Sequence, residues 1–276
     1  MHATILTALL LLAQPTLAGG FKPSKATVGE LVTCLDDPNP GLREDCAEEL
    51  GVRGGDEAAA ALLSAVEQND IARVRLKALD ALVDMRSPLA TSATALMVTR
   101  DAEVANRAHA LAVAERDLGD SVAPTVVAAM QDQDPTIRRK AIIIVGKRGF
   151  SEGEPYLAET AVNDPEIAVV SEAWEALTLL GNPDLRPRVH EALASGPDEV
   201  RKAVAKAMRK KVLPQDRDPL VRALDDANTT VVRDAAKALV ELKDASVAPI
   251  LREKAAAATD DAVKGDLEKC ALELGG

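Results

Sequence analysis

Arginine is the side chain whose spacing most clearly suggests a chemical role in this chain of 276 residues. One arginine recurs every 31 or 32 residues, at Arg43, Arg75, Arg107, Arg138, Arg201 and Arg233. Val170 and Lys264 occupy the two remaining positions of this period. Such a column of guanidinium groups can either bind anions or pair with aspartates at neighbouring turns. Aspartates suited to such pairs precede four of the positions, at Asp37, Asp101, Asp132 and Asp164. We favour an ion-pair ladder between repeats, which predicts a softer fifth repeat at Val170.

The sequence offers little for catalysis or metal binding. Beyond residue 18 its only histidines are His109 and His190, which lie in different repeats, and no Cys/His spacing is typical of zinc. Residues 145–149 (VGKRG) lack the rest of a phosphate-binding loop. Carboxylates are abundant, but no acid/base pair stands out from ordinary helix-surface charge. We therefore predict no catalytic residues, no metal and no cofactor.

Two of the three cysteines are placed to form a disulfide. Cys46 lies three residues after Arg43 and Cys34 lies nine before it, so they should face each other across the first helical hairpin. Disulfides form in exported proteins, and a loop of this length stabilises by about 3 kcal/mol in the chain-entropy model. We predict this bond; the alternative is a pair of free buried thiols. Cys270 is expected to be a part-buried free thiol.

Residues 1–18 (MHATILTALLLLAQPTLA) are typical of a secretory signal peptide. Their apolar stretch is too short to span a bilayer, and small residues precede a cleavage point after Ala18. The alternative is that the segment is retained as an anchor. Residues 19–26 are expected to form a flexible lead-in. These features predict a periplasmic or secreted protein with no stable membrane span after cleavage.

The overall composition excludes one class of partner. Lys plus Arg is 33 and Asp plus Glu is 44, which gives a net charge of -11, and aromatic residues make up 1% of the chain. An acidic chain repels phosphate backbones, and scarce aromatics leave few side chains for stacking on bases. We therefore expect no nucleic-acid partner.

The arginine column must be positioned by helices. Apolar residues recur three and seven residues after each position of the column, which places them on one face of a helix. Asp-Pro pairs at 37–38, 134–135 and 164–165 predict where three of these second helices begin. First helices are predicted at 27–35, 57–68, 88–99, 123–131, 155–162, 185–194, 219–227 and 247–257. Thr27 with Glu30, and Ser151 with Glu154, have the spacing of capping boxes. Gly51, Gly146 and Gly181 are expected to end second helices.

These elements predict an all-α protein: an α-solenoid of about eight helical hairpins over residues 27–276, with a period of 31–32 residues. Residues 134–141 (DPTIRRKA) and 231–239 (VVRDAAKAL) resemble HEAT repeats, and most of all the short bacterial kind that is also found in phycobilin lyase subunits. The repeats are shorter than the roughly 40–47 residues of the eukaryotic type. The resemblance implies a right-handed superhelix whose second helices line a concave, partner-binding face.

Positions one and five residues after the arginine column should be exposed on that face. Their charge changes along the chain, from acidic at the start to basic in the sixth repeat. We select six residues as candidate binding positions: Arg139, Lys140, Glu175, Lys202, Lys206 and Arg209. The alternative is a solvated face with no specific partner.

The sequence thus predicts a monomeric scaffold of the cell envelope that binds a protein or peptide. Two alternatives remain open at this point. One is an enzyme or enzyme subunit of the bilin-lyase type, since those proteins share the repeat; the other is a structural spacer in an envelope assembly.

Overall fold

The computed structural model describes residues 20–275 of the chain, and the predicted signal segment lies outside this part. The chain divides into two compact units, residues 1–119 and 120–276. The described residues contain sixteen α-helices and no β-strand, so the all-α prediction is confirmed. The handedness of the superhelix stays a prediction.

Unit 1 contains three helical hairpins. Its elements are η1 (Pro23–Lys25), α1 (Val28–Cys34), α2 (Pro40–Arg53), α3 (Gly55–Gln68), α4 (Ala72–Asp84), α5 (Ala90–Arg100) and α6 (Val104–Arg116).

Unit 2 contains five more hairpins, for a total of eight in the described residues. Its α-helices are α7 (Ala123–Ala129), α8 (Pro135–Arg148), α9 (Glu154–Asn163), α10 (Ile167–Leu180), α11 (Arg186–Ser195), α12 (Asp198–Lys210), α13 (Arg217–Ala223), α14 (Thr229–Glu241), α15 (Ala248–Ala257) and α16 (Asp261–Gly275). Short 3-10 turns precede four of the first helices: η2 (Asp120–Val122), η3 (Ser151–Gly153), η4 (Pro214–Asp216) and η5 (Ala245–Val247).

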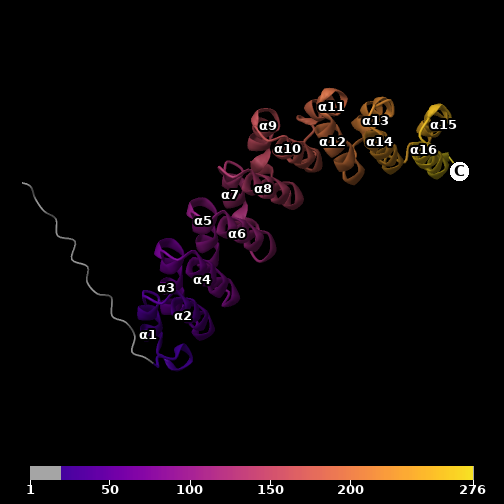
Figure 1. Cartoon of the computed structure of the whole chain (residues 1–276). Coiled ribbons are helices and arrows are strands. Elements are labelled where there is room, and N and C mark those ends of the chain that lie inside the picture. Colours follow the sequence, from indigo (N-terminus) through magenta and orange to yellow (C-terminus); the bar gives the residue numbers. More distant parts are fainter. Residues whose placement is uncertain (1–19, 276) are drawn as a thin grey trace, which may run out of the picture. The chain divides into compact units, whose positions relative to one another are not determined.

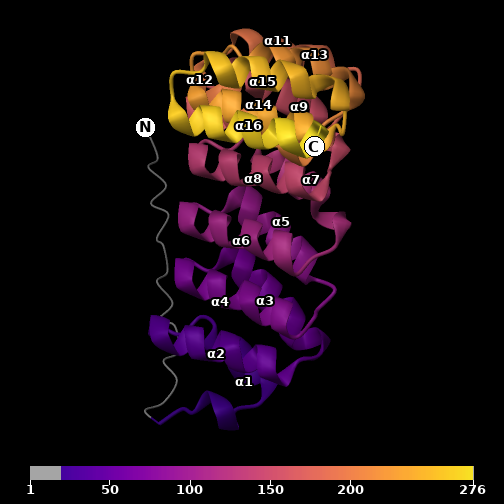
Figure 2. The same ribbon diagram turned by 90° about the vertical axis from the view of Figure 1, so that its right-hand side faces the viewer.

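Within each unit the helices form two layers (Figures 1 and 2). In unit 1 the second helices α2, α4 and α6 lie side by side in one layer, and the first helices α1, α3 and α5 form the other. In unit 2 the layer of second helices runs from α8 through α10, α12 and α14 to α16. The arginine column and its neighbours therefore lie on one layer of each unit.

The predicted core positions are buried because they face the partner helix of the hairpin and the next repeat. All eight residues three positions after the arginine column are buried, from Cys46 to Leu267. Seven residues after the column, Val240 alone is half-buried, and the others are buried. Trp174 is also buried.

Helix starts follow the sequence signals only in part. Thr27 and Glu30 form the predicted capping box of α1, and Asp134 caps α8 by accepting from the backbone N–H of Thr136 at 2.8 Å. The second predicted box is wrong: Ser151 lies inside η3, and α9 begins at Glu154 itself.

The two other Asp-Pro pairs do not begin helices. Helix α2 starts at Pro40 and α10 starts at Ile167, each two residues beyond the proline. Here the aspartates order the turn instead, because Asp37 accepts from the N–H of Asn39 and Asp164 from the N–H of Glu166.

Glycine near the helix ends has two different uses. Gly181 ends α10 with a φ of 72°, as predicted. Gly51 and Gly146 lie inside helices instead, which corrects the expectation. A Cβ on Gly51 would come within 2.8 Å of the Ala81 side chain, and one on Gly146 within 3.0 Å of Ala176. These glycines therefore let α2 approach α4 and α8 approach α10.

The segment before the first hairpin contacts the repeats. Part of the segment predicted to be flexible forms η1, Ala26 is buried, and Arg53 donates to the carbonyl of Ser24 at 2.9 Å. Its mobility stays a prediction. Over residues 20–275, none of the helices combines the length and the apolar character that crossing a bilayer requires.

Candidate functional site

The arginine column lies on the second helices, where its side chains join one repeat to the next. Arg75 on α4 donates from Nε and Nη2 to the two carboxylate oxygens of Asp101, each at 2.7 Å. Its Nη1 donates to the carbonyl of Asn69, in the turn before α4, at 3.0 Å. Arg138 and Arg201 make the same two-pronged contact with the aspartates of the following turns, Asp164 and Asp226. One guanidinium therefore ties two successive turns together.

Three other members of the column make different contacts. Arg43 pairs with Asp70 at 2.5 Å and also donates to the Asn69 side chain at 3.3 Å. Arg233 pairs with Asp266 on α16 at 2.5 Å. Arg107 donates to the carbonyl of Asp101 at 2.9 Å.

The aspartates of this ladder have a second task, because they also cap the turns in which they lie. Asp101 accepts from the backbone N–H of Glu103 at 2.9 Å as well as from Arg75 and from Asn106. Burial disfavours the charged form of Asp101, but these hydrogen bonds outweigh it and hold its pKa below the usual value. Since its side chain is 1% exposed and that of Arg75 13%, the pair lies mostly buried within the stack. These contacts favour the structural ladder over an anion-binding stripe.

The gap at Val170 is matched by a gap in its expected partner. The turn between α11 and α12 carries Gly196 where the other ladder turns carry an aspartate. The arginine and the aspartate of one ion pair, at positions 170 and 196, are therefore both absent. Softening of the fifth repeat stays a prediction, to be tested by comparing hydrogen exchange in α10 with that in α8 and α12.

A buried ion-pair cluster in unit 2 was not anticipated from the sequence. Arg186 and Asp216 are 1% and 0% exposed, and the guanidinium binds both carboxylate oxygens. Arg186 also donates to the carbonyl of Thr178 at 3.0 Å, and His190 contacts Asp216 at 2.7 Å. Burial opposes ionisation of Asp216, yet Arg186, His190 and the N–H of Leu213 together lower its pKa.

One sequence signal could have located this cluster. Arg186 precedes the proline of a first helix, and the equivalent residues in two other repeats are the buried Ala123 and Ala248. A charged residue at such an apolar position requires a buried partner. The cluster links α11 to the start of α13, so its contacts describe a structural anchor.

The candidate binding residues on the second helices of unit 2 lie over a layer of carboxylates. Lys206 and Lys210 both contact Glu175, at 3.0 and 3.3 Å. The lysine side chains are 54% and 57% exposed, and Glu175 is only 12% exposed. Arg209, 42% exposed, likewise contacts Asp234, 11% exposed, at 2.8 Å. Glu175 was predicted to face a partner, but here it lies beneath the cations.

The other predicted residues are less central. Arg139 on α8 is 52% exposed and pairs with Glu172 of α10 at 2.7 Å. Lys140 is half-buried on the same helix. Lys202 lies 3.9 Å from Glu199 on its own helix. The structure therefore gathers Lys206 and Arg209 in one place and leaves Arg139 and Lys140 on a different helix.

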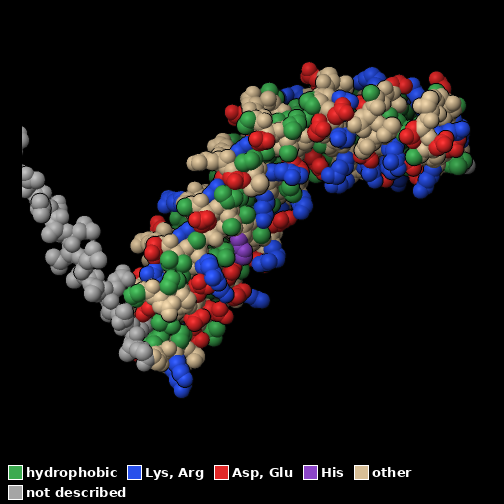
Figure 3. Space-filling model, in the orientation of Figure 1, with side chains coloured by type: hydrophobic (Ala, Val, Ile, Leu, Met, Phe, Trp, Pro, Cys, Tyr) green, Lys and Arg blue, Asp and Glu red, His purple; other side chains and the backbone are tan. Residues whose placement is uncertain are grey.

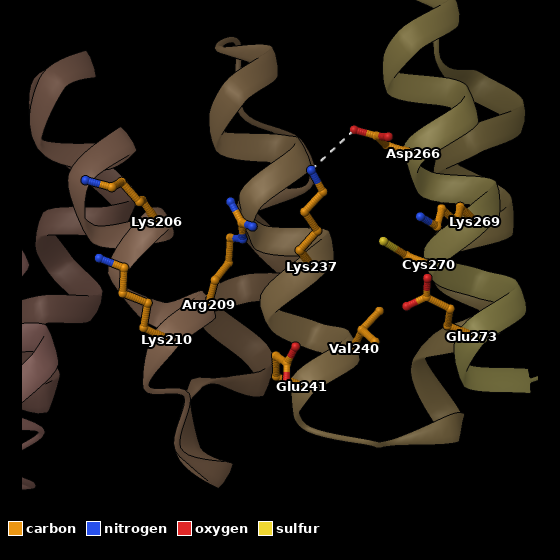
Figure 4. A pocket seen from close by; sticks show the side chains of 10 residues that line it. All are labelled: Lys206, Arg209, Lys210, Lys237, Val240, Glu241, Asp266, Lys269, Cys270 and Glu273. Atoms are coloured by element: carbon orange, nitrogen blue, oxygen red, sulfur yellow. Dashed lines mark ion pairs between the residues drawn. The ribbon is translucent and has the colours of Figure 1, made fainter.

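That place is a groove of about 460 Å³ across α12, α14 and α16 (Figure 4). We call it the basic groove; its lining residues are Lys206, Arg209, Lys210, Lys237, Val240, Glu241, Asp266, Lys269, Cys270 and Glu273. Figure 3 shows basic side chains gathered on this side of unit 2. Lys237 and Lys269 were not among the predicted site residues, although the sequence places Lys269 five residues after Lys264. Cys270 is free, as expected, but it is buried and not part-buried, and burial raises the pKa of its thiol.

Unit 1 has a groove of about 620 Å³ on its own second helices, and its character is different. Three acidic residues (Glu48, Asp80 and Asp84) and two basic ones (Lys77 and Arg116) line it, together with apolar Val52, which is 75% exposed. His109 is half-buried here and contacts Asp80 at 2.6 Å. In residues 20–275, His, Cys, Asp and Glu form no group of three or more that could hold a metal ion.

The first hairpin of unit 1 contains the predicted cysteine pair. The sulfur atoms of Cys34 and Cys46 lie 2.01 Å apart, at bonding distance, and both residues are fully buried. The pair connects α1 to α2 in the repeat that has a neighbour on one side only within unit 1.

The fold and these contacts define an α-helical repeat protein whose repeats are joined by arginine–aspartate pairs. The chain belongs to the HEAT-repeat family: the family pattern matches residues 123–209, 154–236 and 189–270, which together make up more than half of the sequence. The resemblance noted in the sequence is confirmed.

The chain is similar to several solved structures. A protein of Escherichia coli, YibA, aligns with a TM-score of 0.54 and 21% identity over 91% of this chain and 93% of its own. The complex of CpcE and CpcF of phycocyanin lyase from a Nostoc species has a TM-score of 0.40 and 15% identity, over 94% of this chain and 100% of that chain. Human deoxyhypusine hydroxylase in complex with glycerol has a TM-score of 0.39 and 17% identity, over 90% and 95%. No curated protein matches the sequence.

Proposed function

We propose that this protein is a non-catalytic scaffold of the cell envelope that binds an acidic segment of a partner protein in the basic groove. The observation that carries the proposal is that, on the second helices of unit 2, exposed basic side chains lie over carboxylates that are more buried. The side chains of Lys206, Arg209 and Lys210 are 42–57% exposed, and the carboxylates that they contact are 11–12% exposed. A partner that approaches this face therefore meets the cations first.

The internal ion pairs do not prevent such binding. Exposed pairs contribute about 0–1 kcal/mol, because the charges are solvated and the long side chains lose entropy. The cations can therefore exchange a share of these contacts for carboxylates of a ligand. Lys269 is exposed and makes no ion pair with any described residue, so its charge is available as it stands.

The envelope location is part of the proposal and has two supports. Residues 1–18 have the composition of a secretory signal, and Cys34 and Cys46 lie at disulfide distance, which is typical of proteins from oxidising compartments. The intact mass of the protein purified from its source tests this directly. A mature chain that begins at Gly19 supports export, and a cytosolic chain that retains residues 1–18 contradicts it.

Binding is tested with labelled peptides and the full-length protein. A short peptide rich in glutamate should raise the fluorescence anisotropy on binding, and a peptide with lysine in place of glutamate should not. The double variant Lys206→Glu/Lys269→Glu should weaken binding at least about tenfold, equivalent to roughly 1.4 kcal/mol.

A matched control makes the same charge change outside the groove. Lys25→Glu/Lys264→Glu alters two exposed lysines that do not line it. Equal loss of affinity in both double variants would show a general charge effect and contradict the proposed site.

A further inference from the structure

Three consecutive second helices each contribute a lysine to the basic groove. Lys206 comes from α12, Lys237 from α14 and Lys269 from α16, and Figure 4 shows them along one side of the groove. Glu241 and Glu273 lie on the opposite side. The lysine side of the groove presents one lysine per repeat and also holds Asp266, 3.6 Å from Lys237. We call the side with Glu241 and Glu273 the acidic wall.

The spacing of these helices restricts which conformation of a bound chain can use all three lysines. Packed helices lie about 8–10 Å apart, so a segment that crosses α12, α14 and α16 meets a new lysine at about that interval. Its acidic residues must recur at the same interval and point to the same side.

A β-strand does not meet this condition. Residues two apart share a face at about 6.6 Å and residues four apart at about 13 Å, whereas residues three apart point to opposite faces. An α-helix meets the condition less closely. Residues seven apart share a face of a helix at about 10.5 Å, beyond the interval of about 8–10 Å between packed helices.

The polyproline II conformation meets the condition. It has three residues per turn and rises about 3.1 Å per residue, so every third side chain returns to the same face after about 9.3 Å. Resting on the proposed acidic-segment function, we propose that the basic groove binds a polyproline II segment with an acidic residue at every third position. The acidic side chains contact Lys206, Lys237 and Lys269 in turn.

The acidic wall adds a second requirement on this segment. The residues between the acidic positions face Glu241, Glu273 or solvent. Carboxylates at those positions would be repelled, so uncharged residues suit them, and proline favours the conformation itself. A uniformly acidic peptide is thus a poorer ligand than one with acidic residues at every third position.

The test uses peptides of equal length and composition, each with three glutamates among proline, alanine and serine. In separate peptides the glutamates lie two, three, four or seven residues apart, and affinities for the full-length protein are measured by fluorescence anisotropy. The peptide with a spacing of three should bind about tenfold more tightly than the others. A peptide with a spacing of seven that binds best would indicate a helical ligand and overturn the proposal.

A variant of Lys237, the middle lysine, distinguishes recognition of the glutamate spacing from non-specific attraction between opposite charges. Lys237→Ala should remove the advantage of the spacing of three, while Arg233 still pairs with Asp266 and holds α14 to α16. Lys264→Ala is the matched control on α16 and should keep that advantage. Equal affinity of all four peptides would overturn the preference for acidic residues at every third position and leave the binding of acidic segments intact. If none of the peptides bound, both proposals would be overturned.

Discussion

The two units share one internal scheme, but the grooves on their second helices are lined by different sets of charged residues. In unit 1, Glu48 is 68% exposed and the lysine that it contacts, Lys77, is 43% exposed. In unit 2, Lys206 is 54% exposed and its partner Glu175 is 12% exposed. Both units join their repeats through the same arginine–aspartate ladder. The comparison shows that packing fixes the ladder. The positions one and five residues after the arginine column are free to vary, and their side chains set the charge that each surface exposes.

The units also differ in how their interiors are anchored. Unit 1 has the cysteine pair in its first hairpin, and unit 2 has the buried cluster of Arg186, Asp216 and His190. The cysteine pair is covalent and stabilises the fold by restricting the unfolded chain. The cluster of unit 2 is ionic, and its contribution depends on every charged partner being present. Changes to each should therefore act locally and by different amounts.

The largest effect is expected from Asp216→Ala. This change leaves the guanidinium of Arg186 buried without its carboxylate, which costs about 3–5 kcal/mol of the free energy of unfolding. Urea denaturation gives the total, and hydrogen exchange should show the loss around α11 and α13. Replacing both residues by leucine should recover much of the stability. A loss below about 1 kcal/mol would contradict an anchoring role.

Removing the cysteine pair should have the next largest effect, confined to unit 1. Cys34→Ala with Cys46→Ala should lower the free energy of unfolding by about 3 kcal/mol, because the unfolded chain gains the entropy of an open loop. Hydrogen exchange should rise in α1 and α2 and stay unchanged in unit 2. The bond itself is tested by alkylation of the denatured, unreduced protein, and labelling of both cysteines would rule it out.

A ladder rung should matter more than a surface pair on the same helix. Arg75→Ala removes hydrogen bonds to a buried carboxylate and should cost about 2 kcal/mol. Lys77→Ala, the matched control on α4, breaks only the exposed contact with Glu48 and should cost less than about 1 kcal/mol. Thermal denaturation of both variants measures the loss of stability. Equal losses in the two variants would contradict a structural role of the ladder.

Acid should weaken the buried arginine–aspartate pairs of both units. The pKa values of Asp101, Asp164 and Asp216 are all lowered in the folded protein, because hydrogen bonds from arginines outweigh the effect of burial. A lowered folded-state pKa contributes stability that is present above the unfolded pKa of about 3.9 and is lost as the pH falls through the folded value. Stability should therefore be steady above about pH 5 and decline below about pH 4. A decline that starts near pH 6 would point to histidine instead.

Much of the fold could be predicted because the signals that specify it are local and repeated. The apolar positions after each arginine recur eight times, so the second helices and their buried faces were identified from the spacing alone. The cysteine pair followed from the same register. Helix starts were less certain, because Asp37 and Asp164 order a turn before the helix and leave the first helical residue two positions beyond the proline.

The site was harder to predict because exposure depends on contacts between repeats. Glu175 has the same place in its repeat as Lys206, yet it lies beneath the lysines of the following helix. Lys237 is one residue away from the expected column, and only the structure places it in the groove. Arg186 and Asp216 are 30 residues apart, and no repeated pattern marks their contact.

The central claim is that acidic segments bind the second helices of unit 2 and do not bind those of unit 1. Hydrogen exchange measured by mass spectrometry on the full-length protein, with and without saturating glutamate-rich peptide, tests it most directly. The account predicts added protection in α12, α14 and α16 and no change in α2 and α4. Protection in unit 1, or no change anywhere at saturation, would contradict it.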